Sequence, residues 1–301
     1  DGTPSSRLGY PMHFSPNGKS LFFTDNELGS PNLVMMDMDS GDVTILSEIF
    51  TDLWFDMNPA GDTLVFVKKI GHGTAIFSLP LDSSAAAIRL SYETDPRNPV
   101  FSVDGSLVVY TARDMFGSKN LYTIQPDGSA YKKVTSFNDP ADAVVPVGIT
   151  TLEPSILYVM PSQTIKNQFE IWSINLDGSS DQFLTVCTLE ADDRPRISPN
   201  GEKVLYQRDH NLWIMNIDGS EQVRLTDLPS GHLAYHGQYS PSGSHIVYIH
   251  RMGNWGAESF IEWVRPNGQD FSRLSERHNI VLSDNEIQAN NNFRFWPVFQ
   301  P

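Results

Sequence analysis

One stretch of the chain, "GHLAYHGQYSPSGSHIVYIHRMGNW" at residues 231–255, concentrates side chains that can do chemistry. It holds four of the eight histidines of the protein: His232, His236, His245 and His250. A neutral imidazole binds divalent transition metals and acts as a general base near neutral pH. Arg251 and Trp255 close the stretch, and an arginine binds a carboxylate through two parallel hydrogen bonds. The stretch therefore predicts either a metal site or a surface for an anionic ligand.

Further arginines are candidates for the same surface. Arg97, Arg194 and Arg208 lie in predicted loops or strand ends on the same side of the molecule as Arg251, and Arg113 is a further candidate binding residue. Each can bind a ligand carboxylate. Each can also pair with a neighbouring aspartate, and four such neighbours are present: Asp95, Asp192, Asp193 and Asp209. Both interpretations stay open at this point.

A repeated phrase builds the elements that position these residues. "SPNGKSLFFTD" at 15–25 returns as "SPNGEKVLYQRD" at 198–209, and related segments begin at residues 11, 54, 99, 146, 194 and 237. Dipeptides such as Asn17-Gly18 and Asn200-Gly201 allow the positive φ of a tight turn, and β-rich runs follow at once. A second turn follows in the units, as at Asp127-Gly128 and Asp218-Gly219. Each unit predicts a four-stranded antiparallel meander.

Six meanders that recur at a period of about 40 residues predict a β-propeller. We expect an all-β, six-bladed β-propeller in a single domain, 1–301, with seven blades as the alternative. The blades are expected near 11–47, 54–92, 99–136, 146–186, 194–227 and 237–275, followed by a closing tail, 276–301. No segment has a sustained apolar period of about 3.6 residues, so helix content should be very low.

The meander also predicts which residues meet. The loop into the first strand of a blade and the loop between its second and third strands emerge at the same end of the sheet. We therefore expect His232, His236 and His250 to lie at one rim with Arg251 and Trp255. His245 follows a turn glycine and should lie at the opposite rim. Three tryptophans are expected at one repeat position of the third strand, packed between blades: Trp172, Trp213 and Trp263.

The sequence lacks features that several classes of function require. The net charge is -15 without a Lys/Arg-rich block, which argues against nucleic acid as a partner. No apolar run of about 18 residues exists, so no membrane insertion is expected. Cys187 is the single cysteine, which excludes an intrachain disulfide and a thiolate zinc cluster. The motifs G-x-S-x-G, H-E-x-x-H, G-x-G-x-x-G and the P-loop are absent.

The repeats resemble those of a known family. "SPNGK", the aromatic-rich strand after it and "LWIMNIDGSEQVRLT" are similar to the repeats of the TolB-like propellers, named for the periplasmic protein of the Tol-Pal system. The resemblance covers nearly the whole chain and is faint in the fourth unit, where "TTLEPSI" replaces the turn. It implies a propeller in a periplasmic or secreted protein. Such repeats also occur in peptidase propeller domains, lyases and binding modules, so they specify architecture better than function.

The last quarter also resembles the oligogalacturonate lyases, propeller enzymes that cleave uronate oligomers by β-elimination with a divalent metal such as manganese. The matching elements are Gly231-His232, the loop from His250 to Trp255, and "FRFWP" in the tail. The resemblance implies a metal (Mn or Ca) held by several His and a Gln, here His232, His236, His250 and Gln288. Asn290 to Asn292 depart from the His-rich pattern expected there, and amide oxygens bind transition metals more weakly than imidazole.

β-Elimination also needs a base and a positive charge beside the enolate-like intermediate, which makes Arg194 and Arg208 the catalytic candidates. Three hypotheses remain. The favoured one is a TolB-like binding module, with no certain cofactor, which engages a protein or glycan at one rim of the axial funnel. Its binding candidates are Arg97, Arg113, Arg251 and Trp255. The alternative is a divalent-metal-dependent polysaccharide lyase on acidic oligosaccharides. The third is a propeller from a larger enzyme or assembly whose other part carries the activity.

Overall fold

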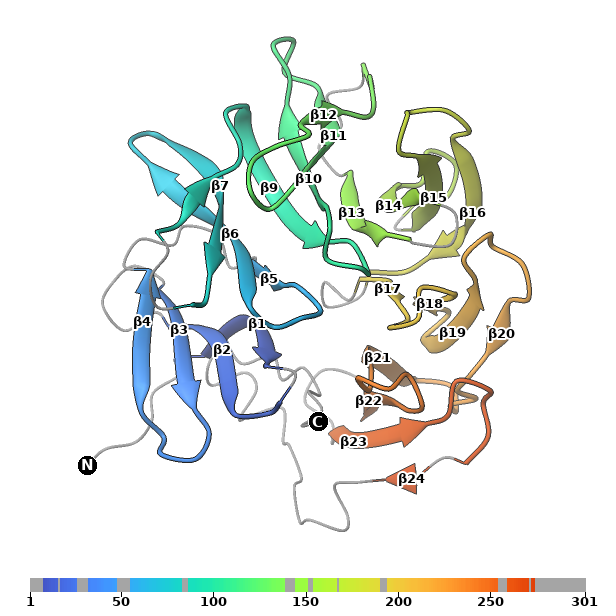
Figure 1. Cartoon of the computed structure of the whole chain (residues 1–301). Helices are drawn as coiled ribbons and strands as arrows, with labels where there is room; N and C mark the ends of the chain where they lie inside the picture. The colour runs from blue at the N-terminus through green and yellow to red at the C-terminus, as the bar shows by residue number, and fades with distance from the viewer. Residues whose placement is uncertain are drawn as a thin grey trace.

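The computed structural model describes residues 8–15, 17–25, 32–47, 55–82, 86–138, 144–150, 154–166, 168–189, 194–253, 259–270 and 272–273. Its regular elements are 24 β-strands, and these ranges contain no helix. The strands form six four-stranded antiparallel sheets arranged as a ring (Figure 1). This confirms the predicted six-bladed all-β propeller. Trp255, Gln288 and the predicted closing tail, 276–301, lie outside the described residues.

Each blade is a meander whose first strand lies nearest the axis (Figure 1). Blade 1 is β1 (Leu8–Phe14), β2 (Ser20–Asp25), β3 (Asn32–Asp37) and β4 (Val43–Ser47), and blade 2 is β5 (Phe55–Met57), β6 (Thr63–Ile70), β7 (Gly73–Pro80) and β8 (Ile88–Arg89). Blade 3 is β9 (Thr94–Phe101), β10 (Val108–Arg113), β11 (Lys119–Ile124) and β12 (Lys132–Lys133), and blade 4 is β13 (Val145–Ile149), β14 (Ser155–Pro161), β15 (Phe169–Asn175) and β16 (Gln182–Cys187). Blade 5 is β17 (Arg196–Ile197), β18 (Lys203–Arg208), β19 (Asn211–Asn216) and β20 (Val223–Arg224), and blade 6 is β21 (His232–Tyr239), β22 (Ile246–Met252), β23 (Ser259–Val264) and β24 (Ser272–Arg273).

The repeated "SPNG" phrase is the turn between the first and second strands. Gly201 has a φ of 76°, and its N–H donates to the carbonyl of Ser198 at 2.8 Å. The Ser198 hydroxyl accepts from the backbone N–H of Lys203 at 2.9 Å. Ser15 accepts from Ser20 in the same way, also at 2.9 Å. The phrase therefore closes a hairpin, and its repetition is architectural.

The core lies between blades. One aromatic residue of each second strand is buried against the preceding or following blade: Phe22, Phe66, Tyr110, Tyr158, Tyr206 and Tyr248. Tyr110, for example, packs with Val65 and Ile76 of blade 2. All four tyrosines also donate a hydrogen bond, and the acceptors are Glu93, Asp181, Gln222 and Glu262. A buried phenol needs such a partner, because an unpaired hydroxyl at this depth is costly.

The residue opposite this aromatic on the third strand differs in blade 6. Trp172 pairs with Tyr158 and Trp213 with Tyr206, as predicted. Trp263 instead pairs with Val247, and its ring contacts His245 at a centroid distance of 4.7 Å. The prediction that Trp263 shares the repeat position was wrong, because the position opposite Tyr248 is occupied by Glu262.

The described residues contain no helix that is long and apolar enough to cross a membrane.

Candidate functional site

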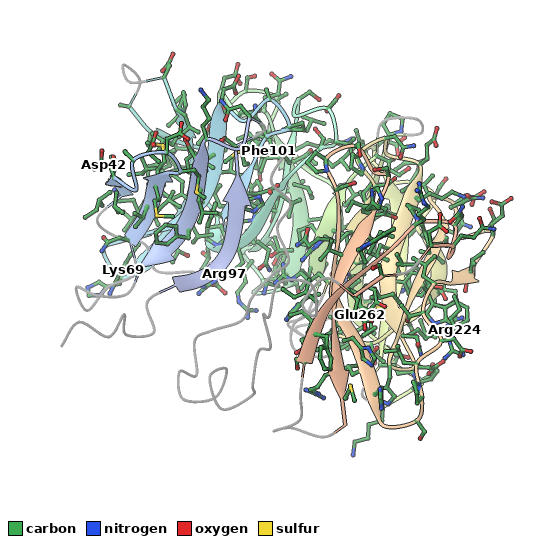
Figure 2. The ribbon with its side chains drawn as sticks, turned by 90° about the horizontal axis from the view of Figure 1, so that it is seen from below. Asp42, Lys69, Arg97, Phe101, Arg224 and Glu262 are labelled. Atoms are coloured by element: carbon green, nitrogen blue, oxygen red, sulfur yellow. The ribbon has the colours of Figure 1, made fainter. Side chains whose placement is uncertain are left out.

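The predicted site residues lie at the rim of the propeller where first strands begin and second strands end, which we call the mouth rim. His232 at the start of β21 pairs with Met252 at the end of β22. Figure 2 shows Lys69 and Arg97 toward this rim, with Asp42 and Phe101 toward the other. His245 follows the turn between β21 and β22, so it lies at the opposite rim, as expected from the meander.

Strand β9 is distorted where it reaches the mouth rim. Asp95 and Asn98 have φ values of 51° and 54°, and each precedes a proline. The pairing of β9 with β10 is irregular on both sides of Thr111. A non-glycine residue at positive φ costs of order 1–3 kcal/mol, and a following proline restricts it further. Backbone strain of this kind concentrates at functional sites and persists only where surrounding groups hold it.

Side chains from three elements hold the distorted segment. The Asp95 carboxylate contacts Arg97 Nε at 2.8 Å and Arg113 Nε at 3.5 Å. Arg194 Nη2 donates to Asn98 Oδ1 at 3.2 Å. Arg194 precedes the first strand of blade 5, so this contact to blade 3 bypasses blade 4. We call Asp95, Arg97, Asn98, Arg113 and Arg194 the mouth cluster.

The mouth cluster brings two guanidinium groups to the Asp95 carboxylate and a third, that of Arg194, to the amide oxygen of Asn98. Guanidinium groups form bidentate hydrogen bonds with carboxylates, so this arrangement can bind an anionic group of a ligand. Arg97 and Arg113 also fit the other interpretation of the sequence, in which an arginine pairs with a nearby aspartate, because both contact Asp95.

Two other predicted arginines are used for packing. The Arg208 guanidinium lies 3.7 Å from the centre of the Trp213 ring. It donates to Gln222 Oε1 at 3.0 Å and to Thr185 Oγ1 at 3.3 Å, which ties blade 5 to the outermost strand of blade 4. Arg251 is 8 % exposed, and its Nε donates to the carbonyl of Gly253 at 3.3 Å. None of these contacts of Arg208 and Arg251 involves a residue of the mouth cluster.

The histidines of blade 6 form a chain that ends on a buried carboxylate. His232 Nδ1 lies 2.9 Å from His250 Nε2, and His250 Nδ1 lies 3.1 Å from Glu262 Oε2. The Tyr248 hydroxyl donates to the same Glu262 oxygen at 2.9 Å. Glu262 is fully buried (0 % exposed), whereas His232 is half-buried at the mouth rim. His236 lies on a separate bulge of β21, with a φ of 54° and its ring against Tyr235.

Sequence reasoning missed Glu262, although the repeat carried a signal. The residue opposite the buried aromatic of the second strand is Met35, Phe77, Tyr122, Trp172 or Trp213 in the other five blades. A carboxylate at this one position in blade 6 is a departure from the repeat that an alignment of the units by strand register reveals.

The described residues do not fit a divalent ion as they are arranged. Both ring nitrogens of His250 are engaged, one with His232 and one with Glu262. Within the described ranges, no group of three His, Cys, Asp or Glu side chains could hold a metal ion. Since Gln288 lies outside these ranges, the full predicted ligand set remains a prediction.

Asp56 and His13 form a second polar group, on the first strands near the axis, which the sequence analysis did not predict. We call these two residues the axial group. Asp56 on β5 accepts from the backbone N–H of Phe101 on β9 at 2.8 Å and lies 3.7 Å from His13 Nε2 on β1. Burial raises the pKa of Asp56, although His13, the Phe101 hydrogen bond and Arg196 act against this rise. Burial also lowers the pKa of His13, and the nearby Arg196 lowers it further against the effect of Asp56. Asp56 thus joins the first strands of three blades.

No family model matches the chain, and no curated protein matches it. Among solved structures it is similar to TolB from Acinetobacter baumannii, with 19 % identity and a TM-score of 0.54, over 72 % of this chain and 54 % of that one. An oligogalacturonate lyase in complex with manganese matches with 13 % identity and a TM-score of 0.60, over 87 % and 78 % of the chains. A puromycin hydrolase mutant matches with 15 % identity and a TM-score of 0.66, over 90 % and 47 %. The chain spans about half the length of the TolB and puromycin hydrolase chains. These likenesses show the fold.

Proposed function

We propose that the protein is a propeller binding module whose mouth cluster holds a carboxylate-bearing ligand, either a protein segment or an acidic oligosaccharide. The observation that carries the proposal is the contact of Arg194 with Asn98, at the strained segment that Arg97 and Arg113 also surround through Asp95. The bulge at Asn98 recurs at His236 of blade 6, whereas the positive φ of Asp95 has no counterpart at Leu233, which precedes His236 by the same number of residues. Strain that is retained in this way is consistent with a preorganised site.

The site would act outside the cytoplasm. This periplasmic or secreted location rests on the resemblance of the repeats to TolB-like propellers and on the fold likeness to TolB.

Titration with two anionic probes tests the binding function. Fluorescently labelled oligogalacturonate and a labelled oligoglutamate peptide would be titrated with the wild type and with Arg97→Gln and Arg194→Gln. We expect at least one probe to bind, and each variant to weaken its binding by about tenfold, as for loss of a well-placed charged hydrogen bond. Arg265→Gln is the matched control, because Arg265 pairs with Asp270 in the turn after β23, at the opposite rim. Absence of binding to both probes, or equal loss in the control, argues against the proposal.

The metal-dependent polysaccharide lyase is the second candidate. The approach of His232 and His250 to 2.9 Å at the mouth rim favours it, whereas the two occupied nitrogens of His250 do not. Elemental analysis of the purified protein, titration with manganese and calcium, and an assay for unsaturated uronate products would test it. Stoichiometric metal that His236→Ala abolishes, together with product, would favour the lyase over the binding module.

A further inference from the structure

The three most exposed large apolar side chains of the described residues come from two segments at the mouth-rim end of blade 3. Met115 is 89 % exposed, Phe116 83 % and Tyr92 76 %. Met115 and Phe116 lie in the loop between β10 and β11, and Tyr92 lies in the segment that enters β9. Thr94 pairs with Arg113, so both segments leave the same end of the sheet, at the mouth rim. We call Tyr92, Met115 and Phe116 the anchor patch.

The loop that carries Met115 and Phe116 is held by hydrogen bonds at its base. Asp114 Oδ1 accepts from the N–H of Phe116 at 2.9 Å and from that of Ser118 at 3.1 Å. Lys133 contacts the other Asp114 oxygen at 2.9 Å, and Arg113 Nη1 donates to the carbonyl of Gly117 at 2.8 Å. The polar groups thus fix the backbone while the two apolar side chains stay in solvent. A preorganised loop loses little conformational entropy when a partner covers it.

Tyr92 is also held in place. The guanidinium of Arg89 lies 4.5 Å from the centre of the Tyr92 ring. The backbone N–H of Tyr92 donates to Glu93 Oε2 at 3.1 Å. Aromatic and methionine side chains that are presented rigidly are typical anchors of protein interfaces.

The charges around the patch indicate which partner fits. Arg97, Arg113, Lys119 and Lys133 surround the base of the loop, against the carboxylates of Asp95 and Asp114. This is a local excess of two positive charges in a chain of net charge -15. A partner surface with carboxylates would complement it. An anionic membrane is disfavoured, because the whole protein is strongly negative.

We propose that the anchor patch docks a protein partner whose apolar pocket is bordered by carboxylates. This inference rests on the proposed function, a ligand-binding mouth rim, and names its partner class. Met115 and Phe116 insert into the pocket, Tyr92 covers its edge, and the arginines of blade 3 meet the acidic border. A glycan fits less well, because two of the three anchors offer no hydrogen-bonding group to hydroxyls.

A random peptide display library is the probe for this inference. Selection on the wild-type protein should enrich peptides that combine Asp or Glu with large apolar residues. The enriched peptide would be synthesised, labelled and titrated with the wild type and with Met115→Ser/Phe116→Ser. We expect the double variant to bind about tenfold more weakly or worse, as for loss of interface hot spots. Val43→Ser/Ile45→Ser is the matched control, since both residues are exposed apolar side chains on the outer strand β4.

Three results would overturn the inference. They are a library without enrichment, a peptide that binds the double variant as tightly as the wild type, and binding to vesicles that depends on Phe116. The vesicles would be phosphatidylcholine alone and phosphatidylcholine mixed with phosphatidylserine. Unfolding midpoints equal to the wild type would show that the variants are folded. A selected peptide that loses binding in Arg194→Gln and keeps it in Met115→Ser/Phe116→Ser would leave the mouth cluster intact as a site while rejecting the anchor patch.

Discussion

Glu262 is a fully buried carboxylate at a position where the other blades place an apolar side chain. It accepts hydrogen bonds from the Tyr248 hydroxyl and faces His250 Nδ1. Removal of one partner from such a group leaves a buried donor or acceptor without its hydrogen bond, which is more costly than loss of the hydrogen bond alone. At the residue scale, the carboxylate therefore maintains the seam between blades 5 and 6 that Tyr248 helps to fill.

We expect Glu262→Ala to lower the free energy of unfolding by roughly 3 kcal/mol, because it removes the acceptor of the Tyr248 hydroxyl and the partner of His250 Nδ1 and opens a cavity. Glu262→Gln should cost less, because its amide oxygen still accepts from Tyr248. Urea unfolding of the variants measures both values. Glu221→Ala is the control, since Glu221 is exposed and its carboxylate lies 3.2 Å from Lys203 Nζ at the surface. If Glu262→Ala unfolds at the wild-type urea concentration, the chain of hydrogen bonds does not stabilise the seam.

Arg208 allows a second prediction at the residue scale. Its stacking on Trp213 and its hydrogen bonds to Thr185 and Gln222 predict a structural role. Arg208→Ala should lower the free energy of unfolding by about 1–2 kcal/mol, and Arg208→Lys should restore little, because an ammonium cannot stack and fork in the same way. Urea unfolding and titration with the anionic probes separate the roles. Weaker probe binding at unchanged stability would instead place Arg208 in the binding site.

At the scale of elements, the hairpins were predictable and the distorted first strands were not. Asn-Gly and Asp-Gly turns act locally, so the sequence around Asn200-Gly201 was sufficient to place β17 and β18. Strand β9 begins at Thr94, ahead of the expected start of its blade at residue 99. Asp95-Pro96 and Asn98-Pro99 have the local character of strand breakers. Contacts from residues distant in sequence, such as Arg194, keep this segment in the sheet, and a local pattern cannot show them.

The turns between third and fourth strands provide a prediction about blade packing. Gly41 and Gly178 both have positive φ, of 76° and 89°, so alanine is strained at either site. A Cβ at Gly41 would have no neighbour within 4 Å, whereas a Cβ at Gly178 would lie 2.5 Å from the carbonyl oxygen of Val134 in blade 3. Gly178→Ala should therefore destabilise by at least about 2 kcal/mol more than Gly41→Ala, because backbone must move. Equal midpoints in urea would show that blades 3 and 4 separate there without cost.

For the whole molecule, stability depends on how the first strands meet around the axis. Asp56 joins β5 to β9 through the Phe101 N–H and faces His13 of β1. The repeat predicted the blades because every unit carries it. It did not predict this group, because His13 and Asp56 belong to different units, and their contact exists only once the ring has formed.

The axial group predicts how the ring responds to pH. The folded pKa of His13 is lower than its unfolded value of 6.5, mainly through burial, so protonation favours the unfolded chain. The stability that neutral His13 contributes is fully present above pH 6.5 and is lost as the pH falls through the folded pKa. Asp56 acts with the opposite sign, because its raised pKa favours the protonated form in the folded state, and acidification relieves the cost of the buried charge.

Urea unfolding between about pH 7.5 and pH 5 separates the two residues, since this window starts above the reference pKa of His. We expect the wild type to lose stability below pH 6.5, and His13→Gln to lose less, because it removes a group that must stay neutral. His72→Gln is the control: His72 is exposed in the turn between β6 and β7, so its removal should leave the pH profile of the wild type. If the free energy of unfolding depends on pH in the same way for the wild type and His13→Gln, protonation of His13 costs no stability. The contact between blades 1 and 2 would then owe its strength to apolar packing, such as that of Phe22 with Phe55 and Phe66, rather than to His13 and Asp56.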